Sequence, residues 1–201
     1  MKILKPLRFL YALTAMFVFT VSAFADGDCT NCSSVSSSLT LSATAQTAVR
    51  LTIATGSGGA TVTDGGSGAF SVSFGNVNGL GLGTPSAGVS VSTSGSGATY
   101  TTPITVTPTF SGFSSTTGTV KVYQDSTADA ASREAAVEGA SAAAVAGSLP
   151  TTAGTANTVS SSAASGSGIT RYVGVFVSNA NGGSAVTGSL TPKFIYSVSV
   201  P

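Results

Sequence analysis

The chain has 201 residues, of which 42% are hydrophobic and only 7% are charged, and it contains neither histidine nor tryptophan. Its formal net charge is +1, so it lacks the concentrated basic patch that nucleic-acid binding requires. General acid–base catalysis at neutral pH is most often carried out by histidine, which argues against an enzyme. We therefore predict no catalytic residue, no cofactor and no metal site.

Residues 1–25 have the organisation of a secretory signal peptide. Basic residues precede an apolar segment over 9–21, and Ala23-Phe24-Ala25 forms a small-x-small cleavage site. The apolar segment is short for a membrane span, which needs about 20 residues, so a retained anchor is the weaker alternative. Cleavage removes three of the eight basic residues and leaves a net charge of −2. We predict an exported protein, secreted or on the extracellular cell surface, with no membrane span after cleavage.

Residues 26–37 are predicted to form a flexible leader that carries a Cys-x-x-Cys motif, Cys29 and Cys32. Because disulfides form in oxidising compartments, we favour a local disulfide between these two cysteines. A link between subunits and redox or metal chemistry are the alternatives. Structural zinc needs four protein ligands, whereas this chain offers two cysteines and no histidine.

A strict alternation of apolar and polar residues follows over residues 38–54. Successive side chains of an extended chain point to opposite faces, so this segment has one apolar and one polar face. At about 3.3 Å per residue it would span roughly 55 Å, far more than a typical strand. Either it bends near Gln46-Thr47 and folds within its own domain, or part of residues 35–54 packs into a neighbouring subunit. The side chains of that strand-donation interface would be Leu39, Leu41, Ala43, Ala45, Val49, Leu51 and Ile53.

Shorter alternating stretches recur along the chain, separated by Gly, Asn, Asp and Ser. They lie at 70–74, 89–91, 100–110, 120–122, 173–177 and 190–200. Pro103 and Pro108 predict that the third stretch is an edge strand or is divided in two, because proline cannot donate to a sheet ladder. Seven or eight short strands with this punctuation are typical of a sandwich or barrel. We predict an all-β fold, an antiparallel immunoglobulin-like β-sandwich over residues 38–201.

Residues 126–168 are predicted to be a helical and low-complexity insertion in this domain. The part from Ser126 to Glu138 can form a short helix, with Ser126 and Asp129 at capping-box spacing and Gly139 as a stop. The remainder is rich in Ala, Ser, Gly and Thr, and we expect a mobile excursion or a loosely packed strand pair.

The chain resembles bacterial pilins and fibre-forming surface proteins, namely spore-coat-U-like and chaperone–usher pilins and, more distantly, camelysin-like biofilm fibre subunits. The resemblance lies in the leader with Cys29, the alternating strand, the Phe74-Gly75-Asn76-Val77 turn and a strand running to Pro201. In these families an N-terminal extension of one subunit completes the sheet of the next. The cysteines depart from the pilin pattern, because they lie three residues apart instead of bridging strands.

This resemblance implies a structural subunit of an extracellular fibre or pilus that assembles by β-strand donation. It also implies a homo-oligomer or filament, with a periplasmic chaperone or outer-membrane secretion machinery as further partners. The alternative is a secreted carbohydrate- or surface-binding β-sandwich module. Its sugar-binding face would be lined by Tyr100, Tyr123, Tyr172 and Tyr196, although such tyrosines more often belong to the core or to a sheet edge.

Overall fold

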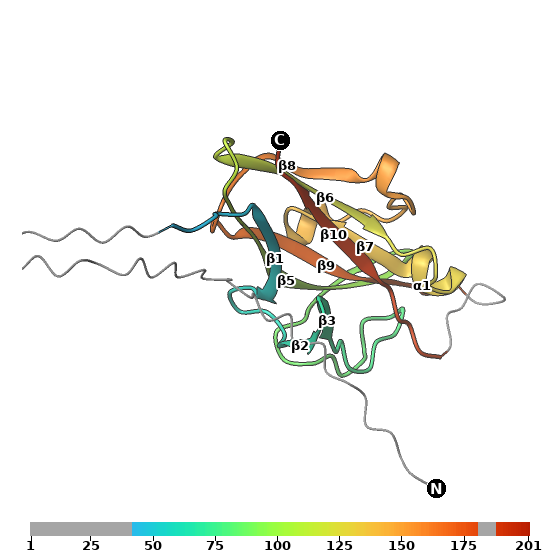
Figure 1. Ribbon diagram of the computed structural model, residues 1–201. Coiled ribbons are helices and arrows are strands. Elements are labelled where there is room, and N and C mark those ends of the chain that lie inside the picture. Colours follow the sequence, from blue (N-terminus) through green and yellow to red (C-terminus); the bar gives the residue numbers. More distant parts are fainter. Residues whose placement is uncertain (1–41, 181–187) are drawn as a thin grey trace, which may run out of the picture. The chain divides into compact units, whose positions relative to one another are not determined.

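Antiparallel strands make up nearly all of the regular structure in the computed structural model, which describes residues 42–180 and 188–201. These strands all belong to the unit Thr47–Pro201 (Figure 1). Helical structure in the described residues is one short α-helix and two single 3₁₀ turns. The all-β prediction is therefore confirmed. None of the described helices has the length and apolarity that crossing a membrane would need.

Three sheets form this unit. The largest has the order β1-β5-β9-β7, and β4 pairs with β5 on the same side as β1; its strands are Ala48–Thr55 (β1), Ser90–Ser94 (β4), Gly97–Ser111 (β5), Ala136–Gly139 (β7) and Ile169–Ser178 (β9). The second has the order β10-β6-β8; its strands are Thr117–Gln124 (β6), Asn157–Ala164 (β8) and Phe194–Ser199 (β10). The third is a hairpin of Val62–Gly66 (β2) and Ala69–Val72 (β3).

Two hydrophobic clusters lie along the long strand β5. The Ile104 cluster takes side chains from both larger sheets, and in Figure 1 β10 crosses the strands of the five-stranded sheet; its buried members are Ile104, Val106, Val120, Val122, Leu149, Ala163, Val173 and Tyr196. The Tyr100 cluster lies nearer the start of β5, and its buried members are Ala98, Tyr100, Val175 and Val177. From its N-terminal to its C-terminal end, β5 thus passes first the Tyr100 cluster and then the Ile104 cluster.

The prediction that proline would place residues 100–110 at an edge or divide them is wrong, because β5 is one central strand with partners on both sides. Pro103 lies in a gap between partners: pairing with β4 ends at Thr101, and pairing with β1 begins at Ile104. The Pro103 carbonyl accepts a hydrogen bond from the Gly56 N–H (3.1 Å), so its backbone polar groups face this gap. No neighbouring strand there needs the missing N–H.

Pro108 lies at a similar gap on the other side of β5. The last β5 residue that pairs with β9 is Val106, and the Pro108 carbonyl accepts from the Gly166 N–H at 2.8 Å, in the turn between β8 and β9. The backbone polar groups of Pro108 therefore point to the β9 side of β5, at a position where β9 no longer pairs with β5. Proline is tolerated in this central strand because each one falls where a partner strand is missing.

The first strand of the domain begins later than the alternation predicted. Residues 42–47 have no regular secondary structure, and β1 starts at Ala48. From there it pairs antiparallel with β5, Ala48 opposite Ser111 and Thr55 opposite Ile104. The second half of the predicted 38–54 ribbon thus folds within its own chain.

The prediction of an insertion over 126–168 needs correction, since this region contributes strands to both larger sheets. The helix α1 is only Ala130–Ala135, and Asp129 is its N-cap, accepting from the Ser132 N–H at 2.9 Å. Hydrogen bonds from Ser132 hold the pKa of Asp129 below its usual value. Gly139 ends the strand β7, not a helix. The leader with Cys29 and Cys32, and the signal peptide, lie outside the described residues.

Candidate functional site

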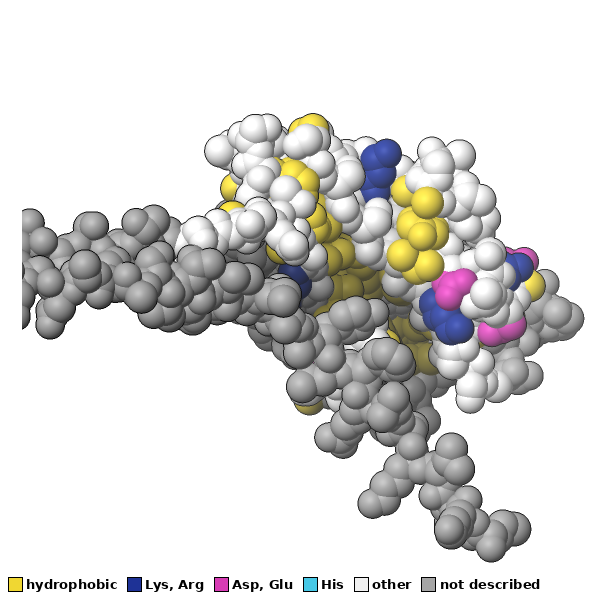
Figure 2. All heavy atoms as spheres, viewed as in Figure 1, with side chains coloured by type: hydrophobic (Ala, Val, Ile, Leu, Met, Phe, Trp, Pro, Cys, Tyr) yellow, Lys and Arg dark blue, Asp and Glu magenta, His cyan; other side chains and the backbone are white. Residues whose placement is uncertain are grey.

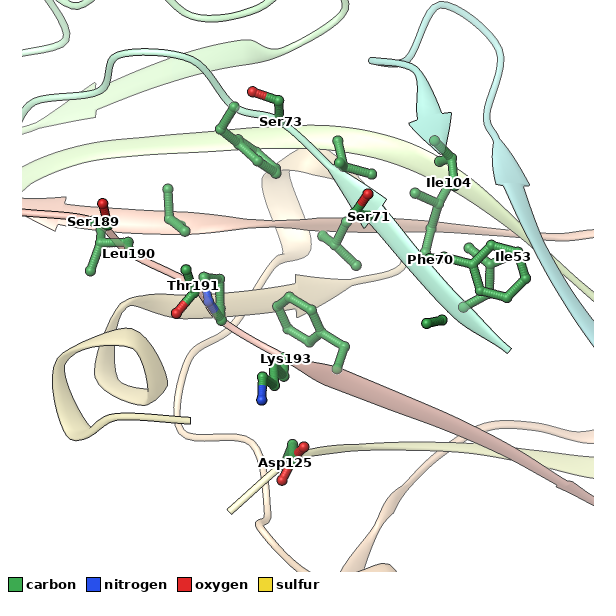
Figure 3. Close-up of a pocket in the computed structure, with 18 of the residues that line it drawn as sticks. Ile53, Phe70, Ser71, Ser73, Ile104, Asp125, Ser189, Leu190, Thr191 and Lys193 are labelled. Atoms are coloured by element: carbon green, nitrogen blue, oxygen red, sulfur yellow. The ribbon is translucent and has the colours of Figure 1, made fainter. Parts of the chain in front are cut away.

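A groove of about 850 Å³ opens between the hairpin β2-β3 and the second sheet. Its floor consists of apolar side chains of the five-stranded sheet, including Ile53 of β1, Ile104 of β5, and Val173 and Val175 of β9. Figure 2 shows hydrophobic side chains gathered at the base of this hollow. In Figure 3 the two walls lie on either side, β3 with its continuation and the segment that leads into β10.

Each wall contains part of a strand: β3 lies in the first, and β10 begins at Phe194 in the second. One wall is the unbroken run 68–77, and the other is the unbroken run 188–196. In an extended segment alternate side chains point to opposite faces, so a wall made of side chains alone would use every second residue. Every residue of each run lines the groove, so the groove follows the course of both chain segments.

The two walls run in opposite directions. Along the first, the chain passes from Val72, whose partner Val62 packs on the Ile104 cluster, to Phe74 and Val77, which pack on the Tyr100 cluster. Along the second, Leu190 packs on the Tyr100 cluster and Phe194 on the Ile104 cluster. The labelled residues of Figure 3 show the same opposed order. We call the two ends of the groove the Ile104 end and the Tyr100 end.

The β10 wall has backbone partners on one side only within the described residues. β10 pairs with β6, and the Lys193 carbonyl accepts from the Asp125 N–H (3.0 Å) in the same register. In an antiparallel strand the polar groups of successive residues point to alternate sides. Those of Phe194, Tyr196 and Val198 therefore point away from β6, toward the groove edge.

The segment that leads into β10 is held by the short helix α1. The Ser132 side chain is fully buried, and its Oγ accepts a hydrogen bond from the Thr191 N–H at 2.8 Å. Because Ser132 also bonds the N-cap Asp129, the helix, the cap and the groove wall form one connected unit. This gives the six-residue helix a positioning role that its alanine-rich sequence does not indicate.

The opposite wall is fixed by Tyr100, which is completely buried below it. The Tyr100 hydroxyl donates to the Asn78 carbonyl (2.9 Å) and accepts from the Asn78 N–H (3.0 Å). Further along, the Phe74 carbonyl accepts from the Ser86 N–H, and the Asn76 N–H donates to the Thr84 carbonyl. Residues 74–76 thus pair with the segment 84–86, as β3 pairs with β2.

A buried ion pair ties the second wall to the five-stranded sheet. Arg171 of β9 donates from Nε and Nη2 to the two carboxylate oxygens of Glu138 on β7, at 2.6 and 2.8 Å. The Tyr196 hydroxyl of β10 donates to Glu138 Oε1 at 3.0 Å. Burial, and next the neighbouring Glu138 charge, raise the pKa of Tyr196 far above its usual value. The hydrogen bonds that Arg171 donates to Glu138 raise the pKa of the Arg171 guanidinium.

The raised pKa of Tyr196 gives a pH-dependent stability. A tyrosine in the unfolded chain ionises near pH 10, whereas folded Tyr196 keeps its proton, so its contribution is intact below pH 10 and falls above it. We expect the free energy of unfolding to decrease by about 1.4 kcal/mol per pH unit above pH 10 from this residue alone. Urea unfolding between pH 9 and 11 measures the slope, and a Tyr196→Phe variant with the same slope would contradict the assignment.

The residues predicted for the strand-donation interface fall into three groups in the structure. Val49, Leu51 and Ile53 lie in β1; Leu51 and Ile53 pack on the Ile104 cluster, while Val49 is 46% exposed. Ile53 also lines the groove. Ala43 and Ala45 are exposed and lie outside any strand. Leu39 and Leu41 lie outside the described residues.

The four tyrosines do not form a common face. Tyr100 and Tyr196 are buried and hydrogen-bonded within the protein, so their rings are not free to stack on a sugar. Tyr123 and Tyr172 are half-buried. Within residues 42–180 and 188–201, no three His, Cys, Asp or Glu side chains come together as a metal site.

The groove itself was not predicted from the sequence. Its walls are far apart in the chain, and alternation in each of them indicates only a strand with one apolar face.

A comparison of the chain with protein-family models, with curated proteins and with solved structures found no match in any of the three.

Proposed function

We propose that this protein is the structural subunit of an extracellular fibre, and that its groove accepts a β-strand from another subunit. Under this proposal the chain is a pilin-like surface protein, as the sequence resemblance implies. The observation that carries the proposal is a groove with an apolar floor between β3 and β10, each of which is an edge strand of its sheet within the described residues. An extended segment placed between them would hydrogen-bond to both edges and cover the floor with alternate side chains.

A strand in this position would join two sheets into one. The hairpin β2-β3 and the sheet β10-β6-β8 together have five strands, and their facing edges are β3 and β10. With the added strand between them they form a six-stranded sheet opposite the five-stranded one. We therefore propose that the filled subunit is a two-layered, immunoglobulin-like β-sandwich that lacks one strand of its own.

The donor that fits is the N-terminal part of the alternating segment, residues 38–46. The apolar side chains Leu39, Leu41, Ala43 and Ala45 occupy every second position, as the groove requires. Since β1 begins at Ala48, these residues are not needed for pairing with β5. This narrows the interface from the full 38–54 segment to its first half.

Deletion of residues 35–46 tests the proposal because it leaves β1 intact. We expect the mature wild-type protein to form oligomers or filaments and the deletion variant to stay monomeric, because it has the groove but no donor. Size-exclusion chromatography with light scattering and negative-stain microscopy measure both states, and circular dichroism checks that the variant keeps its β-structure. A deletion variant that still forms filaments would contradict strand donation from this segment.

A further inference from the structure

We infer that neighbouring subunits of the fibre also contact each other end to end, through Leu80 and Leu82 of one copy and the apolar surface around Val49 of the next. This inference rests on the proposed function and adds to it a second interface, outside the groove. All three side chains are large, hydrophobic and exposed: Val49 is 46% exposed, Leu80 64% and Leu82 78%.

The two leucines belong to a loop, residues 78–83, whose backbone is anchored to the core. The Asn78 side-chain oxygen Oδ1 accepts hydrogen bonds from the N–H groups of both Leu80 and Leu82, each at 3.0 Å. The backbone of Asn78 is itself held by the hydroxyl of the buried Tyr100. The exposure of the leucines is therefore a property of a loop with a defined conformation.

The glycines that alternate with the leucines lie directly on neighbouring backbone. A Cβ at Gly79 would collide with the Ser178 carbonyl at the end of β9, and one at Gly83 would collide with the Asn76 carbonyl. No side chain fits on this inner side of the loop, whereas the positions between the glycines carry the exposed leucines. A loop fixed in this way has little ordering left to lose when it forms an interface.

The second surface lies where the core face of the five-stranded sheet continues past the Ile104 cluster. Val49 shares a face of β1 with Leu51 and Ile53, which pack on that cluster. Val49 itself lies opposite Phe110 of β5. The Phe110 ring packs edge-on against that of Phe113, with the ring centroids 6.4 Å apart. We call Val49, Phe110 and Phe113 the Val49 patch.

The loop 78–83 and the Val49 patch lie at opposite ends of the domain. Gly81, between the two leucines, lies against Ala98 near the start of β5, whereas Phe110 lies near its end. The twelve residue steps from Ala98 to Phe110 span roughly 40 Å. In Figure 1 the loops that join β3 to β4 lie below the sheets, and β1 begins near the top. The two surfaces can therefore meet only between different copies.

The absence of charge makes the two surfaces suitable partners for each other. No charged residue occurs between Asp64 and Lys121, a range that includes the loop and both phenylalanines. Arg50, next to Val49, lies on the opposite face of β1. Contact between the two surfaces therefore buries apolar area on both sides without burying a charge.

The proposed donor segment would hold the Val49 patch beside the neighbouring copy. Three Cα–Cα steps separate Gln46, the last residue of that segment, from Val49, and they reach at most about 11 Å. With residues 38–46 in the groove of an acceptor, the Val49 patch of the donor copy is thus kept near one end of that groove. At the Tyr100 end, the wall 68–77 continues directly into the loop 78–83.

Symmetry selects the end at which the contact forms. If the Val49 patch met the same patch of the next copy, the result would be a closed two-fold dimer, which does not extend into a fibre. Contact with the opposite end of the next copy is head-to-tail and can repeat without limit. Because the donor segment already links the copies, the effective concentration is high and a small apolar contact is sufficient.

Cysteine cross-linking tests this contact in the full-length mature protein. In a background with Cys29→Ser and Cys32→Ser, Val49→Cys is combined with Leu82→Cys in one variant and with Thr158→Cys, at an exposed position of β8, in the control. A short bismaleimide cannot span the roughly 40 Å between the two ends of one copy, so a Val49–Leu82 link joins two copies. Single-cysteine variants control for random collision, and mass spectrometry identifies the linked positions.

We expect a ladder of covalent oligomers from the Val49–Leu82 pair, at least tenfold above the yield from the Val49–Thr158 pair. Assembly that depends on residues 35–46 but gives no excess of this link would overturn the end contact and leave strand donation in place. The same ladder in a variant that lacks residues 35–46 would support the contact and contradict strand donation. A mature wild-type protein that stays monomeric would overturn the proposed function and the contact with it.

A second variant tests the contact without new cysteines. Leu80→Ser with Leu82→Ser leaves the groove and the donor segment unchanged, and we expect the protein concentration needed for assembly to rise at least tenfold. Both side chains are mostly exposed, so the same substitutions in the variant that lacks residues 35–46 should leave its urea unfolding nearly unchanged. An unchanged concentration for assembly would overturn the contribution of the leucines.

Discussion

Placing two carboxylates on the apolar face of the donor, with Leu39→Asp and Leu41→Asp together, is expected to abolish assembly. Under the proposed strand donation, burial of each leucine in the groove would stabilise the complex by about 1.5–3 kcal/mol. Loss of both contributions alone weakens binding by a factor of about 10² to 10⁴. Charged side chains facing the floor that includes Ile53, Ile104 and Val173 add a further cost, since none of these residues can pair with a carboxylate.

A matched control places the same two charges on the other face of the same segment. Thr40→Asp with Ser42→Asp changes the net charge equally but puts the carboxylates on the face that we expect to point away from the floor. We expect this variant to assemble, with filament yield within a few-fold of wild type by sedimentation. Equal loss of assembly in both variants would show that charge alone, and not the apolar face, decides the outcome.

Removal of the Arg171 charge is expected to have the largest effect on stability. In an Arg171→Met variant the Glu138 side chain, which is only 3% exposed, loses both ion-pair hydrogen bonds and keeps only that from Tyr196. Leaving one buried charge without its partner costs about 3–5 kcal/mol. Urea unfolding at pH 7 and one fixed protein concentration measures this loss, because assembly stabilises the folded state by mass action.

The double variant Arg171→Met, Glu138→Gln separates the unpaired charge from lost packing. Replacing a buried pair by neutral groups is often close to neutral in stability, so we expect most of the loss to be recovered. In the single variant the uncompensated carboxyl favours its protonated form, and the destabilisation should shrink as the pH falls from 7 toward 4. A single variant with unchanged stability at pH 7 would contradict a structural role of this ion pair.

The strands of the core were predictable because their sequences alternate. β5, β6, β9 and β10 carry large or β-branched residues at every second position, and these form the two clusters. β8 reads Asn-Thr-Val-Ser-Ser-Ser-Ala-Ala, and most of its side chains are exposed or small. With little apolar surface to bury, an edge strand of this kind has no periodic signal, so the region was predicted as an insertion.

The tolerance of the two prolines and the existence of the groove both depend on tertiary structure. A local sequence pattern does not reveal it. Pro103 and Pro108 are compatible with a central strand only because the neighbouring strands end beside them. The groove walls, 68–77 and 188–196, are more than 100 residues apart in the chain. The segment 38–46 that we propose as the donor, in contrast, shows its apolar face in the sequence itself, whereas the groove that we propose as its acceptor is visible only in the structure.

Amide hydrogen exchange at the free edge of β10 tests the strand-acceptor account most directly. The N–H groups of Phe194 and Tyr196 point toward the groove edge. In the assembled wild-type protein we expect these amides to exchange at least a hundredfold more slowly than in the variant that lacks residues 35–46, while those of Ile195 and Ser197, bonded to β6, change little. Equal exchange of Phe194 and Tyr196 in the two proteins would contradict insertion of a strand.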